Sequence, residues 1–202
     1  MQVYLSTAYF PPVYYFSKIC HSSLVYIESD ENFQKQTYRN RCIILGANGP
    51  LSLSIPIQHT SEPKINIRDV KISYHTPWQK IHLRAIESAY RNSPFYEYYI
   101  HDFLPFFNKK FDFLLDYNQK ILKTCLELAD LKVNIELTNA FTKEHGNDFR
   151  FSISPKKEYP DIQFPEYNQV FIEKFGFVSN LSILDLLFNE GPESRSLLKA
   201  IT

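Results

Sequence analysis

The chain has 202 residues, of which 44% are hydrophobic and 16% aromatic, and its 22 basic and 22 acidic residues leave no net charge. This composition predicts a single compact domain with a substantial core and excludes a disordered chain. Because nucleic-acid binders usually carry an excess of basic residues, the balanced charge argues against a nucleic-acid partner.

The cysteines and the N-terminal segment indicate the cellular compartment. Cys20, Cys42 and Cys125 are odd in number and widely spaced, which fits neither a disulfide framework nor a zinc site. No apolar run approaches the ~20 residues of a membrane helix, and no basic residues precede the first apolar segment as in a signal peptide. We therefore expect reduced thiols, a cytoplasmic location, no metal site and no membrane span.

The N-terminal part of the chain predicts a βαβ unit. Apolar segments at 2–9 and 24–28 indicate strands, and a short helix over 13–20 follows two prolines. A strand, a helix and a second strand in this order favour a parallel pair. We therefore expect an α/β fold.

The ends of these strands give a first candidate site. Ligands of open α/β sheets bind beyond the carboxyl ends of the strands. This rule places Tyr9, Phe10, Glu28 and Asp30 at such an edge. Two interpretations of the aromatic pair stay open: the rings line a cleft, or they simply cover the end of the sheet.

The densest polar run of the chain is 31–41, with the sequence ENFQKQTYRNR. Arg39 and Arg41 can hold a carboxylate or a phosphate by forked hydrogen bonds, and Lys35 can act as a point charge. The run has no glycine-rich phosphate loop. A solvated loop or a frayed helix is the plainer interpretation of the same composition.

A β-hairpin is predicted over 42–56. Two apolar or alternating segments flank Asn48 and Gly49, and both of these residues tolerate a positive φ angle. A polar loop over 59–63 follows. Residues 65–72 then alternate imperfectly, which indicates another strand with a bulge.

The middle of the chain, 76–131, is predicted to be helical. Thr76 suits an N-cap, Pro77 the first helical position and Gln79 a capping box. Two more helical patterns follow, of which the last, over 109–131, has one broad apolar face. That face indicates core packing.

The first of these helices carries the candidate imidazole. One face of this helix carries residues that recur at helical spacing: Trp78, His82, Ala85, Ala89 and Asn92. The adjoining stripe holds Ile81, Ile86 and Tyr90. We expect this whole face to be buried, with Trp78 and His82 beside a cavity. Histidine titrates near working pH and can act as a general base, although a lone buried histidine is more often structural.

The last third mixes irregular and regular segments. Residues 133–138 suggest a strand, and the polar segment 143–165 predicts a loop or a lid that includes a short strand at 149–153. Ser182 as an N-cap, with Asp185 three residues later, predicts a helix near the C-terminus. The N3 position gives Asp185 a plain capping role, because the helix dipole favours an acidic residue there.

Several segments spread along the chain carry a family resemblance. They are 8–12 (AYFPP), 32–41 (NFQKQTYRNR), 43–49, 85–94 (AIESAYRNSP) and 180–191 (NLSILDLLFNEG), together with Trp78, His82, Tyr167 and Gln169. With these segments the chain resembles the WbqC-like proteins, in the short form found in Bacteroidetes.

The resemblance implies a role in surface-polysaccharide or O-antigen biosynthesis, with transfer of an acyl group or an amino acid as the suggested reaction. It also implies that His82 and the polar residues of 34–41 belong to the site. We expect an anionic small-molecule substrate, such as a nucleotide-sugar or an amino-acid donor, in a hollow at the edge of the sheet. The cofactor stays unknown. The expected general base is His82, and the expected substrate-binding residues are Tyr9, Lys35, Arg39, Asn40, Arg41 and Trp78.

A non-catalytic function is the alternative. The sequence has no nucleophile motif, metal-ligand spacing or phosphate loop. The chain would then be a binding or scaffold protein of an envelope-biosynthesis complex, with a protein partner. Exposed aromatic side chains in 95–107 would form its contact surface.

Overall fold

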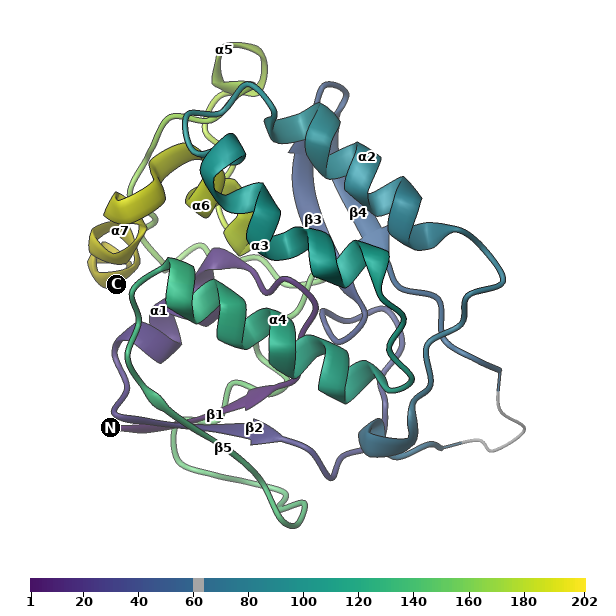
Figure 1. The fold of residues 1–202 in the computed structure, drawn as a ribbon. Coiled ribbons are helices and arrows are strands. Elements are labelled where there is room, and N and C mark those ends of the chain that lie inside the picture. The colour runs from purple at the N-terminus through teal and green to yellow at the C-terminus, as the bar shows by residue number, and fades with distance from the viewer. Residues whose placement is uncertain (60–63) are drawn as a thin grey trace.

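Three short parallel strands form a small sheet at one end of the molecule (Figure 1). The computed structural model describes residues 1–59 and 64–202, so the loop predicted over 59–63 lies, except for His59, outside the described residues. Helix α1 (Val13–Cys20) connects the first two strands, and the predicted βαβ unit is confirmed. In hydrogen-bonding order the strands are β1 (Gln2–Ser6), β2 (Leu24–Glu28) and β5 (Asn134–Leu137).

The predicted hairpin is also confirmed, as strands β3 (Arg41–Gly46) and β4 (Gly49–Ser54). Its turn is shifted by one residue, because Gly49 pairs with Gly46 across the ladder and leaves Ala47 and Asn48 at the tip. Gly49 keeps the positive φ angle, of 106°, that the turn requires.

The strand predicted over 65–72 is wrong. This segment contains the 3₁₀ helix η1 (Ile67–Asp69), flanked by isolated bridges. The Asn66 side chain accepts a hydrogen bond from the backbone N–H of Arg68. Such local side-chain bonds offer the backbone an alternative to a strand ladder.

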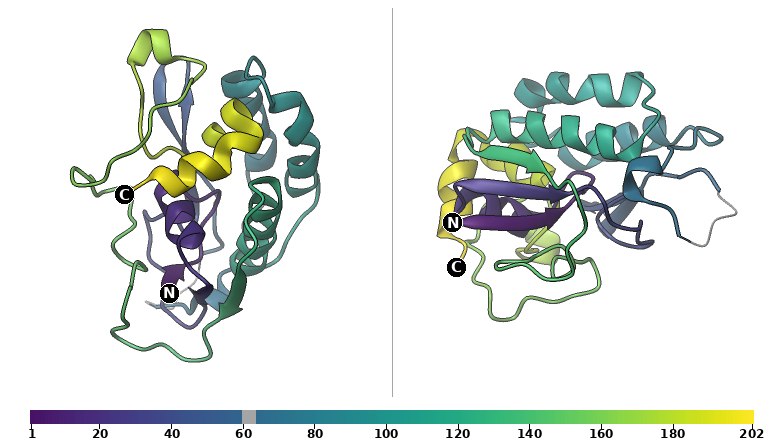
Figure 2. Two further views of the ribbon diagram at one scale, coloured as in Figure 1. Left: turned by 90° about the vertical axis from the view of Figure 1, so that its left-hand side faces the viewer. Right: turned by 90° about the horizontal axis from the view of Figure 1, so that it is seen from below.

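Three helices form the predicted helical middle: α2 (Trp78–Tyr90), α3 (Tyr96–Asn108) and α4 (Leu114–Leu128). The left view of Figure 2 shows them as a layer along one side of the molecule. Helix α4 is shorter than predicted, because Phe113 bridges to Lys71 instead of continuing the helix. None of the helices in the described residues has the length and apolar character needed to cross a bilayer.

The start of α2 differs from the predicted capping box. The helix begins at Trp78, and neither Thr76 nor the N-cap residue Pro77 supplies a side-chain cap. The Gln79 amide instead donates to the backbone carbonyls of Phe106 and Lys109, at 2.9 and 2.6 Å. Gln79 therefore ties α2 to the end of α3.

The face of α2 that the helical spacing predicts to be buried is buried only in part. Trp78, His82, Ile86 and Tyr90 are buried, whereas 55% of the Ile81 surface is exposed. Helix α2 packs against α3 and β3 along the line of the four buried residues, and Ile81 lies off this line. The prediction of burial is therefore wrong for Ile81. It is also wrong for Asn92, which follows the end of α2 and is exposed.

The C-terminal part wraps around a buried helix. The Ser182 hydroxyl accepts from Leu184 N–H, which confirms the predicted N-cap. Seven consecutive residues of the helix that follows are buried, and it packs against α3 and β3. The elements of this region are α5 (Ile172–Phe175), α6 (Ile183–Glu190), η2 (Gly191–Glu193) and α7 (Ser194–Ala200).

The segment 143–165 is a loop, as predicted, but the strand predicted at 149–153 is wrong. Only Asp148 forms an isolated parallel bridge, to Tyr4. Tyr4 N–H donates to Asn147 O, and Phe149 N–H donates to Tyr4 O. The loop therefore covers the outer edge of β1.

Candidate functional site

Four aromatic side chains from three parts of the chain form a buried group, here called the ring cluster: Tyr9, Trp78, His82 and Tyr117. The Tyr9 hydroxyl lies 2.9 Å from His82 Nδ1. The Trp78 ring lies edge-on to the His82 and Tyr117 rings, with ring centroids 5.1 and 5.9 Å apart, respectively. The predicted proximity of Tyr9, Trp78 and His82 is therefore present.

Local structure explains how these rings meet. Tyr9 follows the end of β1, where Phe10 adopts a positive φ of 39° and turns the chain away from the sheet. Trp78 and His82 are four residues apart and so share one face of α2. Tyr117 comes from the first turn of α4. The cluster thus joins the carboxyl end of β1 to the helical layer.

The His82 ring is held neutral. Burial lowers the pKa of His82 to about 4, against a weaker opposing effect of the Ser54 backbone carbonyl. Burial also raises the pKa of the Tyr9 phenol well above its usual value, so this hydroxyl keeps its proton. At neutral pH the pair is therefore an uncharged, buried hydrogen bond.

The β3–β4 hairpin brings two of the predicted binding residues, Asn40 and Arg41, next to the ring cluster. Arg41 stands opposite Ser54 in the β3–β4 ladder, and it is the Ser54 carbonyl that faces His82. The Asn40 amide donates to the carbonyl of the next residue, Ile55, at 2.9 Å. Asn40, Arg41 and His82 therefore adjoin the same two residues at the end of β4.

Three polar atoms around this site lack a hydrogen-bond partner among the described residues. They are Asn40 Oδ1, Arg41 Nε and Trp78 Nε1, and each is shielded from solvent. Two of the three are donors. A buried donor without an acceptor is costly, and an anion or an ordered water can relieve that cost.

Arg39 lies elsewhere. Only 2% of its surface is exposed, and its guanidinium donates to both carboxylate oxygens of Glu31, at 2.7 and 2.6 Å. Such a bidentate pair leaves little of the fork for a substrate. Lys35 is exposed on the turn before Arg39, and no hydrogen bond or ion pair connects it to the rest of the described chain. The structure therefore does not bring Lys35 or the Arg39 guanidinium to the ring cluster.

Arg39 belongs to a second group, here called the charge cluster. Arg150 pairs in it with Glu28, the last residue of β2, and with Asp148. Burial raises the pKa of Glu31, although Arg39 opposes this effect. Among the residues that the structure describes, no three His, Cys, Asp or Glu side chains are grouped to hold a metal ion. The members of the charge cluster are Glu28, Glu31, Arg39, Asp148 and Arg150.

Sequence reasoning missed Arg150, a fully buried charged side chain. It lies in the polar segment 143–165, where composition predicts solvent exposure. Its partner Glu28 is 122 positions away along the chain. No local pattern indicates such a pair, although the sheet-edge rule does predict the position of Glu28.

The Asp185 side chain lies in a buried hydrogen-bond network that the predicted capping role does not include. Its Oδ2 accepts hydrogen bonds from Tyr167, at 2.7 Å, and from Gln169, at 2.8 Å. Burial raises the pKa of Asp185 to about 6. The carboxylate thus fastens the segment before α5 to the core. In the sequence, only the family resemblance points to Tyr167 and Gln169.

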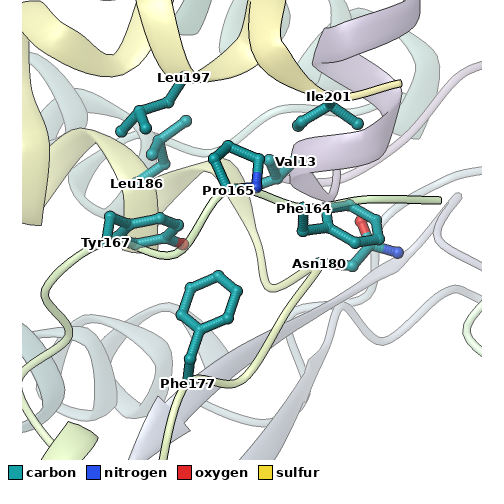
Figure 3. A pocket seen from close by; sticks show the side chains of 9 residues that line it. All are labelled: Val13, Phe164, Pro165, Tyr167, Phe177, Asn180, Leu186, Leu197 and Ile201. Atoms are coloured by element: carbon teal, nitrogen blue, oxygen red, sulfur yellow. The ribbon is translucent and has the colours of Figure 1, made fainter.

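A small cavity lies beside this network, and Figure 3 shows the side chains around it. With about 10 Å³ of space for the centre of a water molecule, it has room for roughly one water. Its wall is mostly apolar, and Tyr167 and Asn180 supply its polar groups. It is too small for a substrate.

The predicted aromatic contact surface is largely absent. Phe103, Phe106 and Phe107 are buried on the inner face of α3. Tyr98, with 74% of its surface exposed, is the large aromatic side chain that projects outward from 95–107. These rings pack into the core because α3 lies between α2, α4 and α6.

Comparison with known proteins gives one assignment. The model of the WbqC-like protein family matches residues 7–156 and 153–197. No curated protein and no solved structure matches the chain. Because the family model covers most of its length, the chain belongs to the WbqC-like protein family.

Proposed function

We propose that the chain is a cytoplasmic transferase of surface-polysaccharide, O-antigen or other cell-envelope biosynthesis. It transfers an acyl group or an amino acid and acts on an anionic small molecule. Family membership supports the biosynthetic setting. The observation that carries the proposal is the buried Tyr9–His82 hydrogen bond beside two unpartnered donors, Arg41 Nε and Trp78 Nε1.

The donors are suited to an anion. Arg41 is partly exposed and has no ion-pair partner in the described part of the chain, so its charge is available to a carboxylate or a phosphate. The Trp78 indole N–H and the Asn40 side chain add polar contacts at the same end of the hairpin. In this proposal Lys35 is an outer point charge, and Arg39 positions Asn40 and Arg41 through its bond to Glu31.

His82 is the proposed general base. A neutral imidazole can accept a proton, and the low pKa of about 4 keeps His82 neutral across the physiological range. Its Nδ1 faces the Tyr9 hydroxyl. In the proposed step, the Tyr9 hydroxyl gives its proton to Nδ1 of His82. The same hydroxyl oxygen receives the proton of the attacking group of the substrate.

A ligand screen tests the proposal. Purified protein is heated with nucleotide-sugars, amino acids and acyl carriers, one class at a time. A ligand at 100 times its Kd stabilises the native state by about 2.7 kcal/mol, which is easily measured as a rise in Tm. We expect a rise with an anionic compound, and no rise with any of the three classes contradicts the proposal.

Variants then locate the site. Arg41→Gln removes the available charge and should abolish most of the ligand-induced rise in Tm. Arg84→Gln removes an equal charge from the exposed face of α2 and should leave the rise unchanged. His82→Gln should abolish turnover while the protein stays folded and still binds the ligand. Unchanged turnover of His82→Gln rejects the role of His82.

One observation favours a second function, that of a non-catalytic binding or scaffold protein. Only 4% of the His82 surface is exposed, and its ring already contacts Tyr9 and the Ser54 carbonyl. A structural histidine has this environment. Stabilisation by a protein partner, with no response to small metabolites in the same screen, would support this second function.

A further inference from the structure

The sheet has one open edge. Strand β5 pairs with β2 alone and is the last strand in the order β1-β2-β5. Thr138 N–H donates to Ile27 O. Because the backbone groups of successive residues in a strand point to opposite sides, every second residue of β5 forms its hydrogen bonds with β2. The backbone groups of Ile135 and Leu137 therefore point away from β2, and no other described segment hydrogen-bonds to them.

The other edge of the sheet is covered by the chain itself. Tyr4 of β1 exchanges hydrogen bonds with Asn147 and Phe149, of 3.1 and 2.9 Å, in a parallel arrangement. An irregular segment thus extends the sheet at β1. The same backbone geometry is available at β5.

A groove runs beside the open edge. It lies between α4 and the start of β5, which Figure 1 shows below that helix, and it has a volume of about 380 Å³. Its apolar wall consists of Leu122, Leu126, Val133 and Ile135. An extended peptide next to β5 would place alternate side chains in this groove.

The charged side chains that line the groove are all positive. Lys120 and Lys123 line it together with Gln119, and none of its lining residues is acidic. The Gln119 amide nitrogen is shielded from solvent and has no acceptor among the described residues. Lys123 meets Glu127 only at 4.0 Å in a widely exposed pair, which is weak and easily exchanged.

We propose that the β5 edge and this groove bind an extended acidic segment of a partner protein as an added strand. The backbone groups of Ile135 and Leu137 supply the ladder. Apolar side chains of the partner pack on the half-buried Val133 and Ile135, and its carboxylates lie against Lys120 and Lys123. The Gln119 amide donates to the partner.

A peptide experiment tests this proposal without knowledge of the natural partner. The probes are fluorescein-labelled ten-residue peptides composed of Val, Ile, Thr, Glu and Asp, and a matched set has Lys in place of the acidic residues. Fluorescence anisotropy reports binding to the full chain. We expect binders in the acidic set and none in the lysine set.

Two pairs of variants assign the contacts. Leu137→Pro removes the outward N–H but leaves the bonds to β2, whereas Leu137→Thr keeps that N–H. We expect Leu137→Pro alone to weaken binding by about tenfold, as expected for the loss of one hydrogen bond. Lys120→Glu with Lys123→Glu should abolish binding, and the exposed pair Lys156→Glu with Lys157→Glu, an equal charge change, should not.

Amide hydrogen exchange of the unmodified chain gives a measurement that does not depend on the folding of any variant. The bound peptide should slow exchange of the Ile135 and Leu137 N–H groups, which are free without it. Absence of any binder in the acidic set, or binding that leaves these two amides unprotected, overturns the proposal. Tight binding of the lysine set overturns the predicted charge of the partner.

Discussion

At the scale of single residues, two buried groups have pKa values shifted in opposite directions. Burial lowers the pKa of His82 to about 4 and raises the pKa of Asp185 to about 6. Both shifts oppose the charged form, because a buried charge loses its hydration. The two groups therefore affect stability with opposite dependence on pH, and each dependence can be isolated by one substitution.

For His82, the native pKa lies below the unfolded value of 6.5, so its contribution to stability is complete above pH 6.5 and is lost as the pH falls toward 4. The shift corresponds to about 3 kcal/mol. His82→Gln should remove this dependence. Urea unfolding at pH 4 to 7 should show a smaller loss of stability on acidification than in the wild type. An unchanged loss would mean that His82 does not titrate in this range.

For Asp185, the native pKa lies above the unfolded value of 3.8, so stability is lost as the pH rises through 6. Asp185→Asn resembles the neutral acid and can still accept from Tyr167 and Gln169. The variant should match the wild type near pH 4 and gain up to about 3 kcal/mol relative to it by pH 7. A gain that does not grow with pH would contradict the assigned pKa.

At the scale of elements, the buried Arg150–Glu28 pair fastens the loop 143–165 to the end of β2. Arg150→Met leaves Glu28 charged and unpaired, which should cost about 3–5 kcal/mol in the free energy of unfolding and expose the loop to proteolysis. Adding Glu28→Gln should restore part of the stability. The control is Arg195→Met, which breaks an exposed pair with Asp130 and should cost less than about 1 kcal/mol. Equal costs for the two arginines would refute the structural role of Arg150.

The turn after α6 gives a second prediction at this scale. Gly191 has a φ of 50°, and an added Cβ would lie 2.5 Å from the Phe95 ring. Gly176 has a φ of 69°, but no atom lies within 4 Å of its added Cβ. Both alanine variants carry backbone strain, and Gly191→Ala adds a clash worth about 1–3 kcal/mol. Thermal unfolding should therefore rank Gly191→Ala below Gly176→Ala, and the reverse order would contradict the packing at Phe95.

At the scale of the whole molecule, the sequence predicts the features that depend on local signals. The hairpin, the βαβ unit and the Ser182 cap are set by a few adjacent residues, and all three are present. The strand predicted over 65–72 failed because a local Asn66 bond outweighed an imperfect alternation. Arg150 could not be found, because its burial depends on a partner 122 positions away.

The candidate site likewise combines residues that local signals predict with residues whose position only the folded structure shows. Helical spacing brings Trp78 and His82 together, and the sheet-edge rule places Tyr9 near them. The polar run 34–41 carries no local signal that separates its arginines. Only the folded chain directs the Arg39 guanidinium to Glu31 and leaves Arg41 without an ion-pair partner in the described part of the chain.

The central claim is that one anionic small molecule binds to Arg41 at the ring cluster, next to His82. Nuclear magnetic resonance of protein labelled with ¹⁵N tests it most directly, by following the His82 ring nitrogens and Arg41 Nε during titration with the compound that gives the largest rise in Tm. We predict that both signals move with the same saturation curve. Movement of other signals, with His82 and Arg41 unchanged at saturation, would contradict the claim.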